Sequence, residues 1–340
     1  MRARGIVERA DRRVMRVLLG LALGLLLLPA AARATITPVR AGAGSPSAAV
    51  AAGRAAGYLR RAQNADGGFG AAPGERSAAL FSGWAALGLA SEGVDIASLR
   101  RGPGDRTLLE YLRVAARATD SGSLERSILA LHAAGAPLTD SAGRDLVRVL
   151  VRRFSRRGSV SGLVNLTAFG LLALCAAHER RTTALESRAA GWLAREANRD
   201  GGYGFAGRGS QSDADDTGAA LQALHCAPRR SAPALTRARR RAVGRAVSYL
   251  RRHQDRDGGF AAAPGAGSNA QSTAWAIQGL RAAGVDPAHL RRDRHTPLGY
   301  LTGLVSRSGR VAYARGQIVT PVWVTGEGLL GLTGTPLPLR

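Results

Sequence analysis

The 340-residue sequence contains no lysine, so its formal charge of +24 at pH 7 comes from arginine alone. Without lysine, the chain has no side-chain amine for a Schiff base and no lysine for a phosphate-binding P-loop. One-sided arginine usage is as typical of a GC-rich coding bias as of an anionic partner. The charge by itself therefore assigns no function.

Cysteine and aromatic residues are also scarce. Two cysteines exclude a disulfide-scaffolded miniprotein, and a content of 45% hydrophobic and 21% charged residues excludes a disordered chain. With 5% aromatic residues and 44 glycines, the apolar mass consists mainly of Ala and Leu between tight turns. This composition favours an all-α fold.

Residues 1–34 have the pattern of a secretory signal peptide. Six of the first sixteen residues are arginine, an apolar run follows over 17–28, and Ala32-Arg33-Ala34 fits a cleavage site. The apolar run is about 12 residues long, shorter than the ~20 that a membrane-spanning helix needs. We expect cleavage near Ala34, a short linker over 35–45, a folded domain over 46–340, and a secreted or extracytoplasmic location.

The two cysteines, Cys175 and Cys226, are expected to form either a disulfide or two buried thiols, since export implies an oxidising compartment. His178 and His225 lie near them in the sequence, but no tight Cys-x-x-Cys pair accompanies them. We therefore expect no metal site and no cofactor.

An internal repeat is the main signal in the chain. An Asp-Gly-Gly-aromatic motif occurs at 66–69, 200–203 and 257–260, each time after one helical pattern and before a second, apolar one. Glycine supplies the positive φ that ends a helix. The repeating unit is therefore a helical hairpin.

The second helices of these hairpins align at residues 82, 124, 167, 217, 273 and 325. Each interval is long enough for two helices and their connections. We predict a closed (α/α)6 ring with the second helices inside. An open solenoid is the alternative, but it needs polar capping repeats, and the last unit ends in the apolar segment 328–332.

The spacing of Tyr58, Gln63 and Phe69 resembles the Gln/aromatic repeat of squalene-hopene cyclases and other class II terpenoid cyclases. A second copy begins at Tyr249, and a third, at Trp192, lacks the glutamine. The same repeat occurs in protein prenyltransferases of this superfamily. The resemblance implies a single (α/α)6 toroid, in agreement with the repeat count.

Segment 213–217, Asp-Ala-Asp-Asp-Thr, matches the acidic DxDD motif of squalene-hopene-type cyclases. Protonating an alkene requires a carboxylic acid that stays neutral, and clustered carboxylates raise a pKa. The resemblance implies that Asp215 donates the proton, that Asp213 and Asp216 tune it, and that Thr217 begins the inner helix behind them.

Helix capping is the other interpretation of this acidic segment. Carboxylates at a helix N-terminus satisfy its free amides and its dipole. The equivalent slots of the next unit hold Asn269, Gln271 and Ser272, so the hairpin itself does not require three acids. The two interpretations are compatible.

Aromatic faces stabilise cationic intermediates. The second helices supply a small set that, together with Thr217, we expect to line a substrate site or else the core: Phe81, Trp84, Phe169, Trp275 and Trp323. The low aromatic content argues against a large polycyclising cavity. The family's cyclases place their site between two toroids, so a partner would have to supply the second wall here, or the chemistry is lost.

The sequence is compatible with two alternative functions. The first is a secreted terpenoid cyclase that protonates and cyclises an isoprenoid through Asp215. The second is a non-catalytic secreted toroid that binds an apolar ligand, a second toroid or a partner protein. The arginine-rich stretch 229–252 fits the solvated face of an outer helix, and an anionic membrane or wall surface is the second interpretation. It does not suit nucleic acid, because no aromatic residues interleave it before Tyr249.

Overall fold

The computed structural model of this chain describes residues 47–118, 120–228 and 233–339. The signal peptide predicted over 1–34, its cleavage site near Ala34 and the linker over 35–45 lie outside these residues. No helix within the described ranges is long and apolar enough to cross a membrane.

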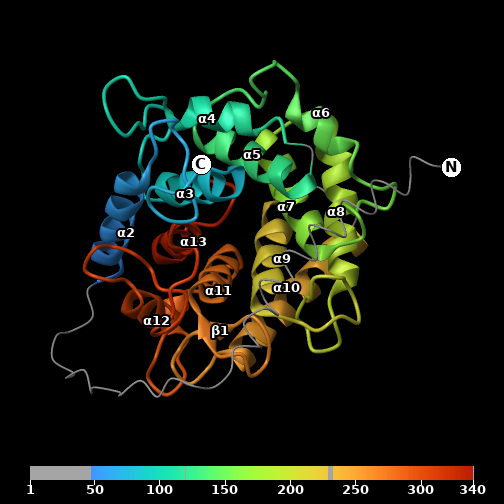
Figure 1. The fold of residues 1–340 in the computed structure, drawn as a ribbon. Coiled ribbons are helices and arrows are strands. Elements are labelled where there is room, and N and C mark those ends of the chain that lie inside the picture. The colour runs from blue at the N-terminus through green and yellow to red at the C-terminus, as the bar shows by residue number, and fades with distance from the viewer. Residues whose placement is uncertain (1–46, 119, 229–232, 340) are drawn as a thin grey trace, which may run out of the picture. The chain divides into compact units, whose positions relative to one another are not determined.

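The helices of the described residues alternate between an inner and an outer ring (Figure 1). The inner ring contains α3 (Ala79–Ser91), α5 (Ser121–Ala133), α7 (Val164–Ala177), α9 (Ala214–Cys226), α11 (Ala270–Ala282) and α13 (Pro321–Thr333). The outer ring contains α2 (Ala48–Ala62), α4 (Leu108–Ala115), α6 (Leu146–Val151), α8 (Thr183–Glu196), α10 (Pro233–His253) and α12 (Pro297–Gly303). Two 3₁₀ turns, η2 (Arg180–Thr182) and η3 (Pro287–His289), and a small antiparallel pair, β1 (Phe260–Ala261) with β2 (Ser268–Asn269), lie between them.

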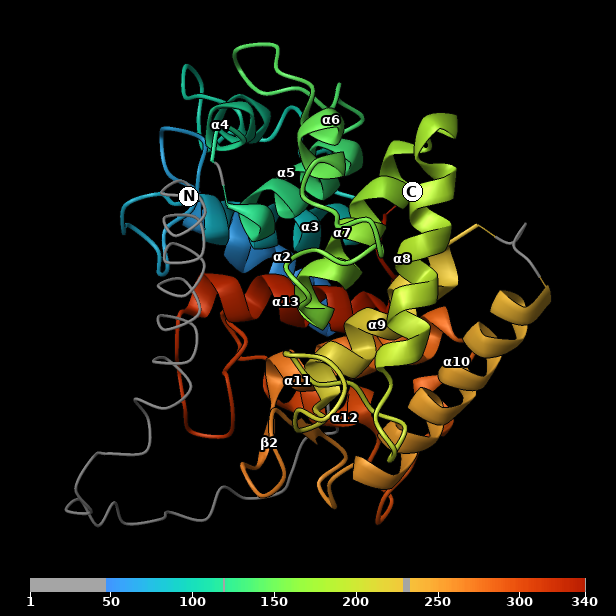
Figure 2. The ribbon, with the colours of Figure 1, turned by 90° about the vertical axis from the view of Figure 1, so that its right-hand side faces the viewer.

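The ring is closed. Each inner helix packs against the next one along the chain, and the last, α13, packs against both α11 and the first, α3. Figures 1 and 2 show α13 beside α3 and α11. The predicted (α/α)6 architecture is therefore confirmed, and the open solenoid is wrong.

Glycine lets the inner helices approach one another closely. A Cβ atom on Gly88 of α3 would lie 2.5 Å from the carbonyl oxygen of Gly326 on α13. One on Gly218 of α9 would lie 2.3 Å from the carbonyl oxygen of Trp275 on α11. Any larger side chain at these positions would push the helices apart, because the obstructing atoms belong to the backbone.

The Asp-Gly-Gly turns share one hydrogen-bond pattern. In the first of them, Gly67 has φ of 84°, and Asp66 Oδ1 accepts hydrogen bonds from the amide of Gly68 at 3.0 Å and the hydroxyl of Ser77 at 2.7 Å. Asp200 and Asp257 make the equivalent bonds in their turns. The repeated motif thus fixes the connection between outer and inner helix.

A second repeated bond fixes the register of the inner helices. The backbone amide of Tyr203, which follows its turn, donates to Thr217 Oγ1 at 2.9 Å. The same bond reaches Ser82, Thr167, Thr273 and Thr325 from the chain that precedes each helix. The sixth aligned position is Leu124, which has no hydroxyl. These bonds confirm the alignment predicted from the sequence.

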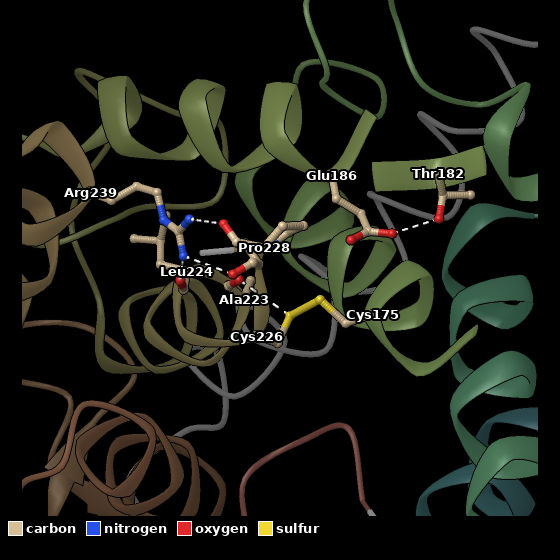
Figure 3. The surroundings of a disulfide bond; sticks show 9 residues. Cys175, Thr182, Glu186, Ala223, Leu224, Cys226, Pro228 and Arg239 are labelled. Carbon is tan, nitrogen blue, oxygen red and sulfur yellow. Dashed lines mark hydrogen bonds between the residues drawn. A yellow bond between two sulfur atoms is a disulfide. The ribbon is translucent and has the colours of Figure 1, made fainter. Parts of the chain in front are cut away.

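Cys175 and Cys226 form a disulfide that joins the ends of α7 and α9 (Figure 3). Of the alternatives left open by the sequence, the disulfide is therefore correct. It closes a loop with a sequence separation of 51, for which chain entropy predicts about 4 kcal/mol of stabilisation. Beside it, the Arg239 guanidinium donates to the carbonyl oxygens of Leu224, Ala227 and Pro228, which satisfies the C-terminal end of α9.

Candidate active site inside the ring

Two layers of side chains face the centre of the ring. The rim layer consists of the residues two positions before each aligned position, which are all partly exposed: Leu80, Gly122, Asn165, Asp215, Gln271 and Trp323. The floor layer consists of the residues two positions after each aligned position: Trp84, Arg126, Phe169, Ala219, Trp275 and Glu327. Four residues separate the layers along each helix, a depth of about 6 Å. Solvent therefore reaches the rim from one side of the ring.

Three aromatic rings meet in the floor. Trp84, Phe169 and Trp275 come from alternate inner helices, and their ring centroids lie 5.3 to 5.8 Å apart in edge-to-face arrangements. At the rim, Phe81 and Trp323 form a second pair with centroids 6.4 Å apart. The structure thus brings together the aromatic residues that the sequence singled out, in two groups, and the first group closes the centre of the ring.

Asp213 is the N-cap of α9. Its Oδ1 accepts the amide hydrogen of Asp216 at 2.7 Å, and Asn269 makes the same bond to the amide of Ser272 at the start of α11, at 2.9 Å. The capping interpretation therefore holds for Asp213. Asp215 and Asp216 lie in the first turn of α9, where their charges also favour the helix dipole, but neither takes the place of the cap.

Asp215 lies in the rim layer, partly exposed, with its Oδ1 atom buried and without a hydrogen-bond partner among the described residues. Burial raises the pKa of Asp215 to about 6; the Ser272 hydroxyl on α11 opposes this shift, and Asp216 adds to it. The carboxyl group therefore keeps its proton to a pH about two units higher than an exposed aspartate does. One of its oxygens remains unengaged by the protein.

Asp216 and Asp213 complete the acidic cluster. Asp216 is 4% exposed and accepts a hydrogen bond from Asn165 Nδ2 at 3.1 Å. Burial raises the pKa of Asp216 to about 6, and burial followed by the two neighbouring carboxylates raises the pKa of Asp213 well above its usual range. The three acids therefore release their protons as a group rather than independently.

Thr217 does not face the ring centre. It is fully buried, and its hydroxyl accepts from the Tyr203 amide and donates to the Asp213 carbonyl oxygen. Both capacities of the hydroxyl are used by the backbone, so Thr217 holds the turn. We leave it out of the candidate site.

Glu327 is an acid of this site that the sequence analysis missed. It lies in the floor layer, 4% exposed, and accepts hydrogen bonds from Trp323 Nε1 and Gln271 Nε2, both at 2.7 Å. Burial raises the pKa of Glu327 to about 7, and the charge of Asp215 contributes to the shift. The signal was present in the repeat, since Glu327 follows Thr325 by the same interval as Trp84 follows Ser82.

The arrangement therefore places a weakly acidic carboxyl group above an aromatic floor. Such a group can protonate an apolar double bond, and the aromatic faces can stabilise the resulting cation. The disulfide removes Cys175 and Cys226 as thiolate ligands for a metal. Two cavities, of about 350 and 540 Å³, are lined by other residues, among them Arg251 and Asp257, and do not include the acidic cluster.

Solved structures similar to this chain include enzymes of different chemistry. A variant of a type II terpene cyclase from Scytonema, in complex with geranylgeranyl dihydroxybenzoate, is 14% identical, with a TM-score of 0.61 over 84% of this chain and 97% of that chain. A polysaccharide lyase is 12% identical, with a TM-score of 0.59 over 84% and 96% of the two chains. A glycosidase is 16% identical, with a TM-score of 0.57 over 85% and 98%. At these identities the similarity shows a shared fold and no shared activity.

No curated protein sequence matches the chain. The family model of the prenyltransferase alpha-alpha toroid domain, however, matches residues 30–114 and 145–307, which is more than half of the sequence. With the closed ring of helical hairpins and the Gln/aromatic repeat, this match settles the family: the chain belongs to the prenyltransferase alpha-alpha toroid domain family.

Proposed function

We propose that this protein is a class II terpene cyclase that protonates an isoprenoid double bond through Asp215. The observation that carries the proposal is the Oδ1 atom of Asp215, which is buried in the rim layer without a partner, on a carboxyl group whose pKa is raised to about 6. A carboxylic acid in this state can deliver its proton to an alkene. The neighbouring cap, Asp213, fixes the helix start that presents it.

The length of the chain is compatible with this chemistry. The Scytonema type II terpene cyclase aligns over 97% of its chain with 84% of this one, so that cyclase is itself about one toroid long. A second toroid is therefore not a general requirement for a cyclase of this type. This supports the proposal, because the sequence analysis had expected a cyclase to need a second toroid.

The mechanism follows from the two layers. The Asp215 O–H bond breaks and its proton forms a C–H bond with one alkene carbon, which leaves a cation on the other. The faces of Trp84, Phe169 and Trp275 stabilise the cation as ring closure moves it along the chain. Water then takes a proton from a carbon next to the cation, which restores a double bond, and the Asp215 carboxylate takes up a proton from water to complete the cycle. No metal or nucleotide takes part in these steps.

The proposed secreted location rests on the sequence of residues 1–34. The Cys175–Cys226 disulfide supports it, because such bonds persist in oxidising compartments. Under this proposal the isoprenoid is taken up outside the cytoplasm.

The test is cyclisation by the purified protein in deuterated water. Geraniol, farnesol, geranylgeraniol and squalene are incubated separately, and the products are analysed by mass spectrometry. We expect a cyclic isomer that carries one deuterium, made by the wild-type protein and by the control Asp293→Asn, whose carboxyl group is exposed. Asp215→Asn should make none, although it should melt at no lower a temperature than the wild-type protein, since it removes a buried charge.

Cyclisation that persists in Asp215→Asn would overturn the assignment. If no isoprenoid is converted by the wild-type protein but one of them raises its melting temperature, the alternative of a non-catalytic toroid that binds an apolar ligand is correct. The closed aromatic floor would serve that function equally well.

A further inference from the structure

The arginines of α10 gather on its outer side. The helix carries seven arginines and no acidic residue, and Figure 2 shows it along the outside of the ring. Arg239 is partly buried against the end of α9, as described above. The other six are exposed: Arg237, Arg240, Arg241, Arg245, Arg251 and Arg252. At about 100° per residue, these six lie within about 140° of the helix circumference, over a length of about 22 Å. We call this surface the α10 basic face.

No acidic side chain of the described residues lies within 4.0 Å of a guanidinium group of this face. Asp286, which lines the same cavity as Arg251, pairs with Arg281 instead, at 3.2 Å. The neighbouring outer helices differ from α10, since α8 carries two arginines and two glutamates and α12 carries no charged residue. Charge of one sign is therefore concentrated on α10.

The arginines of this face are close enough to act together. Arg237, Arg241 and Arg245 follow one another at four-residue intervals, a rise of about 6 Å each. This rise is shorter than the distance of about 8 Å over which physiological salt screens charges. Like charges four residues apart also destabilise a helix. A polyanion that lies along the face would offset this repulsion and release the counterions that screen it.

Two of these side chains are held in place without losing their charge. Arg245 Nη2 donates to the carbonyl oxygens of Asn198 and Arg199, and Arg252 Nη2 donates to that of Asp200 at 2.6 Å. A carbonyl oxygen carries no net charge, and these bonds use Nη2 alone, so the other N–H groups of both arginines are left for an anion. Phosphate oxygens pair with an arginine fork through two parallel bonds. The face therefore presents fixed positive charges that suit phosphate groups.

The side chains of α10 favour an extended polymer over a lipid bilayer. A helix that lies in a membrane inserts large apolar side chains among the lipids. The apolar residues of α10 of this size, such as Leu250, are buried against the protein. Of the residues that the structure describes, the large apolar ones that are exposed belong to other segments: Val50, Val114, Val151 and Ile318. A linear array of charges instead matches a chain whose own charges repeat along its length.

We propose that the α10 basic face binds an anionic polymer of the cell envelope that carries phosphodiester groups along its backbone, and that this contact holds the exported protein at the cell surface. The proposed location selects this polymer over nucleic acid. The aromatic content of the helix agrees, because single-stranded nucleic acids stack their bases on aromatic side chains and Tyr249 is 3% exposed. This inference does not depend on the proposed cyclase activity.

The test is the affinity of the purified protein for fluorescently labelled poly(glycerol phosphate), measured by anisotropy over a series of salt concentrations. We expect the wild-type protein to bind, and its affinity to fall as the salt concentration rises. The triple variant Arg237→Gln, Arg240→Gln, Arg241→Gln should bind at least tenfold more weakly. Its affinity should also depend less on salt, because three contacts to phosphate groups are lost.

The triple variant Arg152→Gln, Arg156→Gln, Arg157→Gln is the matched control. It removes the same charge from three exposed arginines at and after the end of α6, a helix that Figure 2 shows well separated from α10. Its affinity should stay within about twofold of the wild-type value, because salt screens charges far from the binding face. Neither variant should melt at a lower temperature than the wild-type protein, since all six side chains are exposed.

Equal weakening by the two triple variants would overturn the inference, because it would mean that only the net charge acts. Absence of binding at low salt would overturn it as well. Tighter binding, per phosphate, to vesicles of equal parts phosphatidylcholine and phosphatidylglycerol would favour a membrane instead, and tighter binding to oligothymidylate would favour nucleic acid. Cyclisation should be unchanged in both triple variants, so these measurements and the test of the proposed function succeed or fail separately.

Discussion

The starts of α9 and α11 have the same backbone and different chemistry. Asp213 and Asn269 cap the two helices with the same bond, and Thr217 and Thr273 anchor them by the same hydroxyl contact. Between cap and anchor, α9 carries two acids, whereas α11 carries Gln271 and Ser272. The fold therefore requires the cap and the threonine, and it tolerates the acids at the cost of burying them.

Gln271 and Ser272 also show what the acids are positioned against. Gln271 donates to Glu327, and Ser272 lies beside Asp215. The start of α11 thus supplies neutral donors to the carboxyl groups of its neighbours. The two units are complementary halves of one site rather than two copies of one structure.

The largest expected effect comes from giving α9 the chemistry of α11. The double substitution Asp215→Gln with Asp216→Ser keeps the cap and the anchor, so the protein should fold, but it removes the proton donor. We expect isoprenoid cyclisation to fall by at least about 100-fold, the lower range for loss of a general acid. Product formation measures this, and circular dichroism checks the fold.

Asp213→Asn is the matched control for that prediction, since it copies the cap of α11 and leaves Asp215 in place. It should reduce cyclisation far less than the double substitution does. Equal losses from the two variants would mean that the acids act only through the helix start.

The second largest effect concerns pH. The start of α9 contains buried acids and that of α11 does not, so only the former should make the free energy of unfolding depend on pH. Burial raises the pKa of Asp215 and of Asp216 from 3.8 to about 6, so the folded protein binds more protons than the unfolded chain between these values. The free energy of unfolding should therefore fall as the pH rises from about 4 to 7, by about 1–3 kcal/mol. Urea titrations across this range measure it.

The double variant should flatten this pH profile. Asp213, Glu327 and the phenols of Tyr249 and Tyr313 also face the cluster, and Glu327, with a pKa raised to about 7, leaves a residual slope toward pH 8. A wild-type stability that rises from pH 4 to 7 would show that the acids are stabilised as anions.

The third effect, on the free energy of unfolding, comes from the close packing of α9 on α11. A Cβ on Gly218 would lie 2.3 Å from the carbonyl oxygen of Trp275, so Gly218→Ala must move one helix. We expect a loss of about 1–3 kcal/mol in the free energy of unfolding, typical of overpacking. Gly53→Ala on α2 meets nothing within 4 Å and should instead stabilise the protein slightly, because alanine favours helix. Thermal melts of both variants check this contrast.

The smallest effect concerns the caps themselves. Asn269→Ala should cost about 1 kcal/mol, as for other N-cap losses. Asp213→Ala loses the same bond but also relieves repulsion among the buried carboxyl groups, so it should cost less. A larger cost for Asp213→Ala would indicate that its charge stabilises the helix start.

Much of this fold is predictable from sequence because the repeat is local. The Asp-Gly-Gly turns and the aligned threonines each make the same bond in several hairpins, so their pattern in the sequence directly reports their geometry. Gln63 and Gln254 likewise donate to the carbonyl oxygens of Gly67 and Gly258 in equivalent turns.

The composition of the site was harder to predict, since it depends on which side chains face one another across the ring. Glu327 and Arg126 occupy the floor layer but belong to no motif. The family resemblance, which depends on aromatic residues, therefore did not identify them. Thr217, within the acidic motif, was expected at the site and instead supports the turn. The choice between disulfide and thiols also needed the distance between two helix ends.

The closure of the ring has a consequence for the order of folding. The contact between Gly88 and Gly326 joins the first inner helix to the last, so nearly the whole chain must be present before it forms. Neighbouring hairpins can pair early. This contact closes the longest loop, so its cost in conformational entropy falls on the last step of folding. Until α13 arrives, the apolar faces of α3 and α11 stay exposed, and the partly folded chain is then most prone to aggregate.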